Sequence, residues 1–545
     1  MAQLTGLDWT LIAAYFALIF AGAGYATWRE RQGRETSTDY FLAGRNSVWF
    51  IIGASLFASN IGSEHLVGLA GTGAATGVAV AQFEILAALI LLLLGWFFAP
   101  FYLRSGVFTM PEFLERRYSP AARWYLAVIS IIGYVLTKIS VTIFAGGLVF
   151  EALMGIDFWT GAFVVVVATG LYTILGGLRA VLITDAMQMV VLLFGAIAVT
   201  VIGLNAVGGW NELVAAAGPE FMTLWKPVTD PNFPWTGILL GAPILGIWYW
   251  CTDQFIVQRV LAARNLSEAR RGTVFAGFLK LLPLFIFVIP GVIAYVLVQQ
   301  GQLELEVSDH ALPALVGTLL PVGLRGIVVA GLLAALMSSL SSVFNSTSTL
   351  ITWDVYKKIR PDASEQRLVW VGRISTGVLV IFGLLWIPLM GLISGTLYVY
   401  LQSVQAYIAP PIAAVFLLGL FSARLNAHGA MTALLAGFVI GMSRLVLELN
   451  KAALNPDGWV FAFADINFLH FAAILFAVCS LALVLVSVLT PAQPREQVEP
   501  LTLRMAAPDR IARMAQWRVE IILSGLLAAA VLAIWIYFSG WGVAG

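Results

Sequence analysis

The chain has 545 residues, of which 60% are hydrophobic and only 11% are charged. An average soluble protein carries about 25% charged residues, so these charges are too few to cover a water-soluble surface of this size. The composition therefore predicts a polytopic membrane protein. A net charge of +1 argues against a nucleic-acid partner, and two cysteines in apolar runs argue against a disulfide framework or a thiolate metal site.

Apolar runs long enough to cross a bilayer recur along the whole chain. A spanning helix needs about 20 mainly apolar residues. No basic stretch precedes the first run and a basic cluster follows it, so we expect a retained helix there rather than a cleaved signal peptide. The rule predicts about fourteen helices, with approximate limits at 8–28, 47–73, 78–103, 124–153, 158–175, 180–207, 237–258, 273–299, 323–355, 369–389, 393–421, 427–448, 467–490 and 519–540.

Most of the 30 Lys and Arg residues follow every second segment, whereas the other loops are rich in Asp and Glu. The cations assigned to these basic loops include Arg117, Arg123 and Arg259. Because basic loops stay on the cytoplasmic side, both termini are expected to be extracellular or periplasmic. That orientation independently requires an even number of segments.

Two predicted segments contain polar stretches at membrane depth. Residues 55–65 interrupt the second segment and residues 248–254 interrupt the seventh. Paired broken helices in corresponding positions of two halves mark the binding site of many transporters. Each break opens a run of five segments, and an odd-numbered repeat must be inverted in its second copy. The expected organisation is an extra helix and loop at 1–46, a first repeat at 47–207, an extracellular loop at 208–236, a second repeat at 237–421 and three additional helices at 422–545.

Hydroxyl-rich positions in the ninth segment indicate a cation site. Ser338, Ser341, Ser342 and Asn345 follow helical spacing, so they share one face. Hydroxyl oxygens and freed backbone carbonyls suit a hard cation, although such hydroxyls can instead bond to carbonyls of their own helix. Asp185 is a carboxylate inside the sixth segment that could hold a cation or a proton, or simply begin a helix.

These stretches carry a resemblance to the sodium–glucose cotransporters of the solute:sodium symporter family, animal and bacterial. It covers most of the chain, from Asp39 through Phe421, and is most specific in four segments: 58–73, 249–259, 337–346 and 410–419. The resemblance implies an all-α membrane protein of about fourteen helices. Its core would be an inverted five-plus-five repeat of the LeuT type, with a broken first helix in each repeat.

The resemblance also implies two sodium sites. The main site would use the carbonyls of Ala58, Ile61 and Ala335 with the hydroxyls of Ser338 and Ser339. A second site would draw on Asp185, Ser59, Ser338, Ser341 and Ser342. Relatives that carry one sodium per solute exist, so these residues leave the stoichiometry open.

A sugar pocket is the third implication. Phe83 would be the outer gate and Tyr249 the inner gate. Gly246 and Ala87 depart from positions that are polar in some sugar-carrying relatives, which leaves the hexose undetermined. The implied substrate-binding residues are Asn60, His65, Glu84, Tyr249, Trp250, Lys280 and Gln402.

Lys280 lies inside an otherwise apolar segment, where a lone ammonium is costly unless it is paired or reaches the interface. Glu84 is its natural partner. Lys138 and Asp253 are also embedded, and the sequence does not pair them.

The sequence thus predicts a multi-pass plasma-membrane symporter that couples inward sodium movement, with two ions expected, to uptake of a neutral hexose such as glucose or galactose. We expect the protein to require sodium ions and to lie in a lipid bilayer. We also expect it to function as a monomer and not to be an enzyme. Proton coupling, a sensor, a channel, or another solute (sialic acid, a polyol, proline or a vitamin) remain alternatives.

Overall fold

The structure is a computed structural model that describes residues 4–30, 36–62, 64–390, 397–502 and 517–545. The described residues are almost entirely helical. The helices of the first half are α1 (Gly6–Glu30), α2 (Ser37–Leu42), α3 (Trp49–Asn60), α4 (Ala70–Thr76), α5 (Gln82–Leu93), α6 (Ala99–Ser105), α7 (Met110–Arg117), α8 (Pro120–Gly133), α9 (Ser140–Val149), α10 (Phe158–Val207), α11 (Trp210–Met222), α12 (Trp235–Leu240) and α13 (Ala242–Gly246).

The second half contributes the remaining helices. They are α14 (Gln254–Leu261), α15 (Leu266–Leu279), α16 (Ile289–Gln299), α17 (Ala311–Leu319), α18 (Leu324–Leu350), α19 (Lys357–Ile359), α20 (Glu365–Met390), α21 (Leu397–Phe421), α22 (Ala427–Leu449), α23 (Trp459–Asp465), α24 (Phe468–Leu489), α25 (Arg495–Val498) and α27 (Arg518–Tyr537). Wider π-helical turns join several of them, including 64–69 and 247–252.

Helix starts follow ordinary capping chemistry. The side chains of Thr109 and Ser119 accept backbone N–H bonds at the first turns of α7 and α8, and a proline stands just inside each helix. Asn426 caps α22 in the same way. These short polar residues therefore set the bounds of helices whose sides are otherwise apolar.

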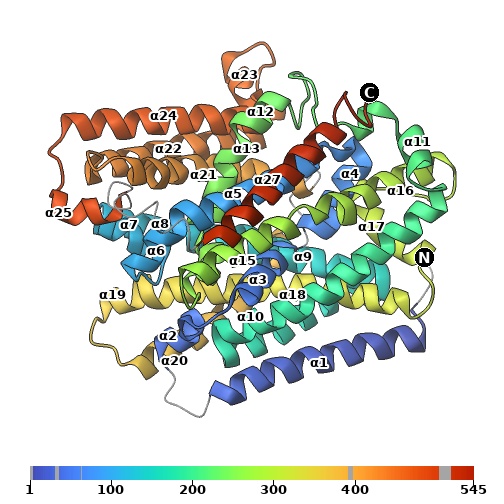
Figure 1. Ribbon diagram of the computed structural model, residues 1–545, viewed down its shortest axis with the longest axis horizontal. Helices are drawn as coiled ribbons and strands as arrows, with labels where there is room; N and C mark the ends of the chain where they lie inside the picture. Colours follow the sequence, from blue (N-terminus) through green and yellow to red (C-terminus); the bar gives the residue numbers. More distant parts are fainter. Residues whose placement is uncertain (1–3, 31–35, 63, 391–396, 503–516) are drawn as a thin grey trace.

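Among the described residues, eleven helical stretches are long and apolar enough to cross a membrane. The long helices run in the same general direction, with both termini at one end of the bundle and α19 and α25 at the other (Figure 1). The prediction of a polytopic all-α membrane protein is confirmed. The predicted number of fourteen crossings remains a prediction. The pieces of a broken segment are too short to be counted as long helices, and α10 is counted once although it covers two predicted segments.

The reversing helix is α10, which covers two predicted segments. Gly177 has φ +53° and ψ −153°, a left-handed conformation that a side chain would strain. Tyr172 packs against Phe20 of α1, and Met187 lies against Gly22 of the same helix. A straight helix would separate positions 172 and 187 by about 22 Å, so the chain turns back at Gly177.

Both predicted helix breaks are confirmed. After α3, Ile61 is extended (φ −75°, ψ 90°), and the chain resumes as a π-helical turn before α4. The π-helical turn after α13 ends at Thr252. Asp253 is extended (φ −81°, ψ 127°) and caps α14 through the N–H of Phe255.

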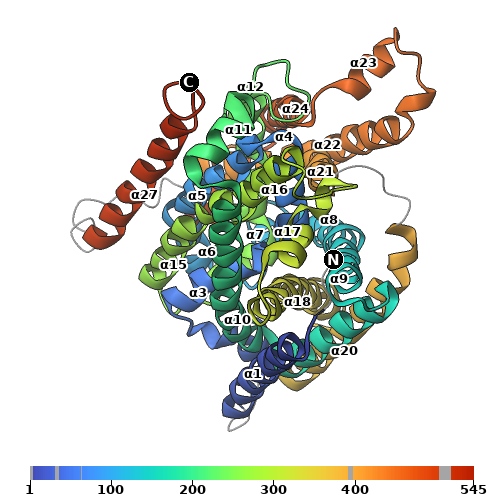
Figure 2. The ribbon, with the colours of Figure 1, turned by 90° about the vertical axis from the view of Figure 1, so that its right-hand side faces the viewer.

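Helix α18 lies at the centre of the core. It packs against α10, α3, α1 and α9, and nearly every side chain from 328 to 350 is buried. Helices α1 and α27 lie at the periphery (Figure 2). The hydroxyl-rich face of α18 therefore points into protein rather than toward lipid.

The assignment of Arg117, Arg123 and Arg259 to exposed loops is wrong, because all three are buried. Arg117 donates to the carbonyls of Gly419, Ser422 and Leu425 at the end of α21, where helical carbonyls lack partners. Arg123 pairs with Asp354 at 2.7 Å. Charge counting along a sequence does not distinguish a loop cation from one that closes a helix end inside the protein.

Candidate functional site

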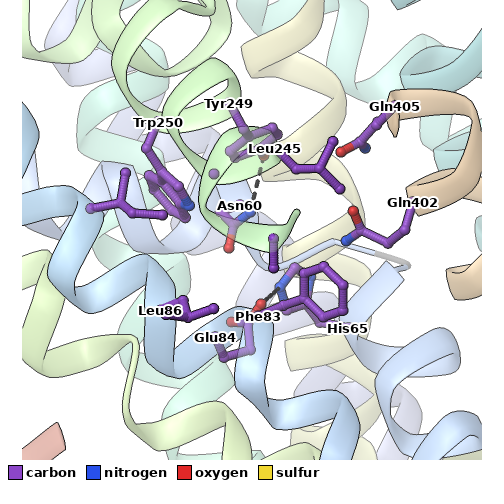
Figure 3. A pocket seen from close by; sticks show the side chains of 13 residues that line it. Asn60, His65, Phe83, Glu84, Leu86, Leu245, Tyr249, Trp250, Gln402 and Gln405 are labelled. Atoms are coloured by element: carbon purple, nitrogen blue, oxygen red, sulfur yellow. Dashed lines mark hydrogen bonds and ion pairs between the residues drawn. The ribbon is translucent and has the colours of Figure 1, made fainter. Parts of the chain in front are cut away.

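A cavity of about 630 Å³, including the space at its mouth, lies between the broken helices. It is lined from α3, the two π-helical turns, α5, α13 and α21 (Figure 3). Its lining residues are Asn60, His65, Phe83, Glu84, Leu86, Ile90, Ala242, Leu245, Gly246, Tyr249, Trp250, Gln402 and Gln405.

A buried ion pair lies at the base of this cavity. Lys280 is fully buried at the end of α15, and its ammonium donates to Glu84 and to the side-chain oxygen of Asn60. His65 Nε2 lies 3.1 Å from Glu84 Oε1 and 3.5 Å from Lys280 Nζ. The expected pairing of Lys280 with Glu84 is present, and it neutralises a charge that would otherwise be costly at this depth.

Lys280 itself does not line the cavity. The other six predicted substrate-binding residues do, and Lys280 lies behind three of them. Since its ammonium faces Asn60, Glu84 and His65, Lys280 fixes the orientation of these side chains rather than presenting a donor of its own to the cavity.

The two broken helices are joined across the cavity. Asn60 Nδ2 donates to the hydroxyl of Tyr249 at 3.0 Å. The Trp250 ring lies 5.3 Å from the Lys280 ammonium, a cation–π distance. Asn60, at the end of α3, is therefore held by Tyr249 and Lys280 from the later part of the chain, so a movement of α3 relative to these segments changes its contacts.

Two glutamines approach the cavity from α21. Figure 3 shows the amides of Gln402 and Gln405 directed toward it from the same side. Gln405 was not predicted, although its spacing of three residues from Gln402 places both on one helix face. His65 Nδ1 has no hydrogen-bond partner among the described residues, so it too can bond to a ligand.

Phe83 also lines the cavity and meets Phe233 edge to face, with ring centroids 6.1 Å apart. Gly246 is explained by its surroundings. A Cβ there would come within 2.1 Å of Ile90 Cδ1, so a larger residue fits only if Ile90 moves.

A second group of polar residues gathers where α3 ends against α18. Carbonyls at the C-terminal end of α3 lose their helical partners at the break, although the Phe57 carbonyl still accepts from the Ile61 N–H. Ser339 Oγ donates to the Ser59 carbonyl at 3.0 Å. Ala335, Ser338 and Ser339 lie one turn apart on the facing side of α18, so hydroxyl and carbonyl oxygens meet as a hard cation requires.

Asp185 lies beside this group and is fully buried. It accepts hydrogen bonds from Ser338 at 2.5 Å, Ser55 at 2.5 Å and Ser59 at 3.0 Å. Ser342 Oγ donates to Ser59 Oγ at 3.0 Å. Ser59 and Ser338 of the predicted second set thus converge on this carboxylate, and Ser342 reaches it through Ser59.

Ser341 differs from the rest of this set, because its hydroxyl donates to the Ser338 carbonyl of its own helix at 2.9 Å. Sequence reasoning also missed Ser55 and Arg259 at this carboxylate. Ser55 stands one helical turn before Ser59, a spacing that could have revealed it. Arg259 Nη2 lies 4.0 Å from Asp185 Oδ2.

Lys138 and Asp253, which the sequence left unpaired, form a buried ion pair at 2.7 Å. Tyr134 donates to the same carboxylate. The ammonium also lies 4.6 Å from the ring of Tyr249. The pair thus fixes the start of α14 next to the residue predicted as the inner gate.

No group of three or more His, Cys, Asp and Glu side chains suited to a transition metal occurs among the described residues. Two helices, each broken at a polar site in the core and facing one cavity, are typical of an ion-coupled secondary transporter.

Comparisons with known proteins assign the family. Residues 40–437 match the model of the sodium:solute symporter family. The chain is 40% identical to the sodium/myo-inositol cotransporter of Mus musculus, covering 92% of this chain and 76% of the relative. It is also 40% identical to sodium/glucose cotransporter 1 of Ovis aries, covering 89% and 78%. The chain belongs to the sodium:solute symporter family, and it is a sodium-coupled solute symporter.

Solved structures of similar fold support this architecture. A Na⁺-coupled sialic acid symporter in a substrate-bound outward-open state aligns over 90% of this chain and 99% of its own, with a TM-score of 0.75 at 23% identity. Mhp1, a nucleobase-cation-symport-1 transporter, aligns over 86% and 99%, with a TM-score of 0.54 at 14% identity. At these identities the likeness shows the fold alone.

Proposed function

We propose that the chain couples inward movement of two sodium ions to uptake of a neutral hexose such as glucose or galactose. The observation that carries this proposal is the internal neutralisation of the cavity. Glu84 and Lys280 compensate each other, so the described lining residues offer hydroxyl, amide and imidazole groups without an uncompensated charge. Such groups suit a polyhydroxylated neutral solute, and the Trp250 and Tyr249 rings suit its C–H face.

A cyclic polyol such as myo-inositol is the second candidate. Relatives named as sodium/myo-inositol and sodium/glucose cotransporters are equally identical to this chain, at 40%. The same neutral cavity argues against an acid sugar, because a carboxylate would meet no unpaired cation among the described lining residues.

For sodium, the main site is proposed at the carbonyls of Ala58, Ile61 and Ala335 with Ser338 and Ser339. The second is proposed at Asp185 with Ser59, Ser341 and Ser342. Oxygen ligands and a helix break meet at both, which supports them.

Alternating access follows from these positions. Sodium at the end of α3 would tie the first repeat (47–207) to the second (237–421) and fix Asn60 for the solute. Solute binding would then favour closure of Phe83 and opening at Tyr249. Coupling of this kind is a difference in affinity between two states, so it acts equally in both directions. The segments at 1–46, 208–236 and 422–545 flank or connect the repeats.

The proposal also covers the oligomeric state, the membrane location and orientation, and the driving force. The protein would work as a monomer in the plasma membrane, with both termini on the extracellular or periplasmic side. The location of both chain ends at one end of the bundle supports a shared side for them, and the proposed side follows from the basic loops. Each sodium crossing at −100 mV would contribute about 2.3 kcal/mol, and a tenfold sodium gradient about 1.4 kcal/mol more.

Radiolabelled uptake into proteoliposomes tests the proposal. Glucose, galactose, myo-inositol, proline and sialic acid would each be offered with an inward sodium gradient, with potassium replacing sodium, and with a pH gradient alone. We expect sodium-dependent accumulation of a hexose above the other solutes. Preferential accumulation of proline or sialic acid would overturn the assigned substrate class, and uptake driven by the pH gradient alone would overturn sodium coupling.

A further inference from the structure

Arg259 is a buried cation beside the proposed second sodium site, and its role is not explained by solute binding. Its side chain is fully buried. Nε donates to Ser55 Oγ at 3.1 Å and Ser59 Oγ at 2.8 Å, and Nη1 donates to the Phe255 carbonyl. Nη2 makes no hydrogen bond within the described part of the chain and lies 4.0 Å from Asp185 Oδ2.

The guanidinium and a sodium ion would share the same oxygen atoms. Ser55 and Ser59 both donate to Asp185 and both accept from Arg259. Two positive charges next to one buried carboxylate repel each other strongly at this depth, where little water screens them. A sodium ion bound at Asp185 therefore requires the guanidinium to move.

Acceptors for a displaced guanidinium exist nearby. Both amide atoms of Asn345 are buried without a hydrogen-bond partner among the described residues, and so is Oε1 of Gln258. Buried amides without hydrogen-bond partners are costly and rare, so we expect these atoms to gain a partner in another state of the transporter. Gln258 directly precedes Arg259 in α14.

The position of Asn345 on α18 locates it with respect to Asp185. Ser338, Asn345 and Thr349 follow helical spacing on one face. Ser338 donates to Asp185 at 2.5 Å, and Thr349 accepts from Gln258 Nε2 at 2.8 Å. Asn345 therefore lies between the contact with Asp185 and the contact with α14.

We propose that Arg259 is a tethered cation that competes with the second sodium ion for Asp185. When sodium binds, the guanidinium moves to the amide oxygens of Asn345 and Gln258. The inference rests on the proposed second sodium site. It explains how a buried carboxylate keeps a positive partner in both the loaded and the unloaded transporter.

The test compares two substitutions with opposite expected effects. Arg259→Met removes the competitor, so the sodium concentration for half-maximal sugar uptake falls at least threefold. Asn345→Leu removes the acceptor for the displaced guanidinium, so that concentration rises at least threefold. If the substitutions merely damaged the fold, the half-maximal sodium concentration would rise in both variants.

Arg117→Met is the matched control, because Arg117 is also a buried arginine, and it donates to backbone carbonyls near the end of α21 and lies over the Tyr118 ring. It should leave the half-maximal sodium concentration unchanged. Uptake into proteoliposomes with choline replacing sodium supplies the readout. Thermal unfolding in detergent establishes that each variant is folded.

Asp185→Asn separates failure of this inference from failure of the second site. If Asp185→Asn leaves the sodium:sugar flux ratio unchanged, the second sodium site and the competition with it are both overturned. If Asp185→Asn lowers the ratio while Arg259→Met fails to lower the half-maximal sodium concentration, the second site stands and the competition is overturned.

Discussion

Substitution of Lys280 by methionine should disrupt the solute cavity without removing any side chain that lines it. The ammonium donates to Glu84 and Asn60 and lies 3.5 Å from His65 Nε2. Without it, Glu84 becomes a buried carboxylate whose one remaining partner among the described residues is His65. Removing one member of a buried ion pair costs about 3–5 kcal/mol of stability.

The effect on affinity follows from the two side chains that Lys280 orients. Loss of a fixed hydrogen-bonding direction at Asn60 and at Glu84 should cost about 1–1.5 kcal/mol each. Since each 1.4 kcal/mol corresponds to a factor of ten, the sugar dissociation constant should rise by about 100-fold. Sugar binding to purified protein at saturating sodium measures the affinity, and thermal unfolding in detergent measures the stability.

A double variant separates charge from geometry. Lys280→Met combined with Glu84→Gln removes both charges, so stability should recover because an uncompensated ion is no longer buried. Affinity should stay low because the side-chain oxygen of Asn60 still lacks the ammonium that orients it. Wild-type affinity in the Lys280→Met protein would refute the reasoning, and so would full recovery of affinity in the double variant.

The remaining predictions concern sodium and solute selectivity. Ser339→Ala should raise the sodium concentration for half-maximal uptake at least threefold. Ser346→Ala should not, because the Ser346 hydroxyl bonds to carbonyls of its own helix. Equal effects of the two substitutions would remove Ser339 from the main site. Asp185→Asn should lower the sodium:sugar ratio toward one in parallel isotope fluxes, and an unchanged ratio would exclude Asp185 as a ligand. Gln402→Ala should abolish sugar binding, and Gln405→Ala should alter the order of preference among hexoses and myo-inositol in competition assays; an unaltered order would place Gln405 outside the solute contacts.

Much of the fold follows from local sequence signals. Apolar runs, capping residues and the two polar interruptions predict the helices and both breaks because each signal acts within one or two turns. The turn at Gly177 is different. Two helices meet at Gly177 without a loop between them, so the glycine conformation and the contacts with α1 reveal the reversal.

The candidate site was partly predictable for a related reason. Family resemblance supplied Asn60, Glu84 and Gln402, and chemistry supplied the pairing of Lys280 with Glu84. Contacts between distant segments were not available from one sequence. The Lys138–Asp253 pair joins residues 115 positions apart.

Arg259 illustrates the same limit. Arg259 lies close to a basic cluster in the sequence, so charge counting assigned it to a loop. In the structure its guanidinium lies beside Asp185. A cation within one turn of a helix end can face either direction, and only packing decides which.

The zero-flux sugar gradient is the most direct test of two-sodium coupling to a neutral hexose. Proteoliposomes would be clamped at zero voltage with a tenfold inward sodium gradient, and the internal sugar concentration would be raised until net sugar flux stops. Two sodium ions per sugar predict balance at about a 100-fold sugar gradient, since the tenfold ratio enters twice. Balance without any dependence on the sodium gradient would contradict sodium coupling, and balance near tenfold would contradict the second sodium ion.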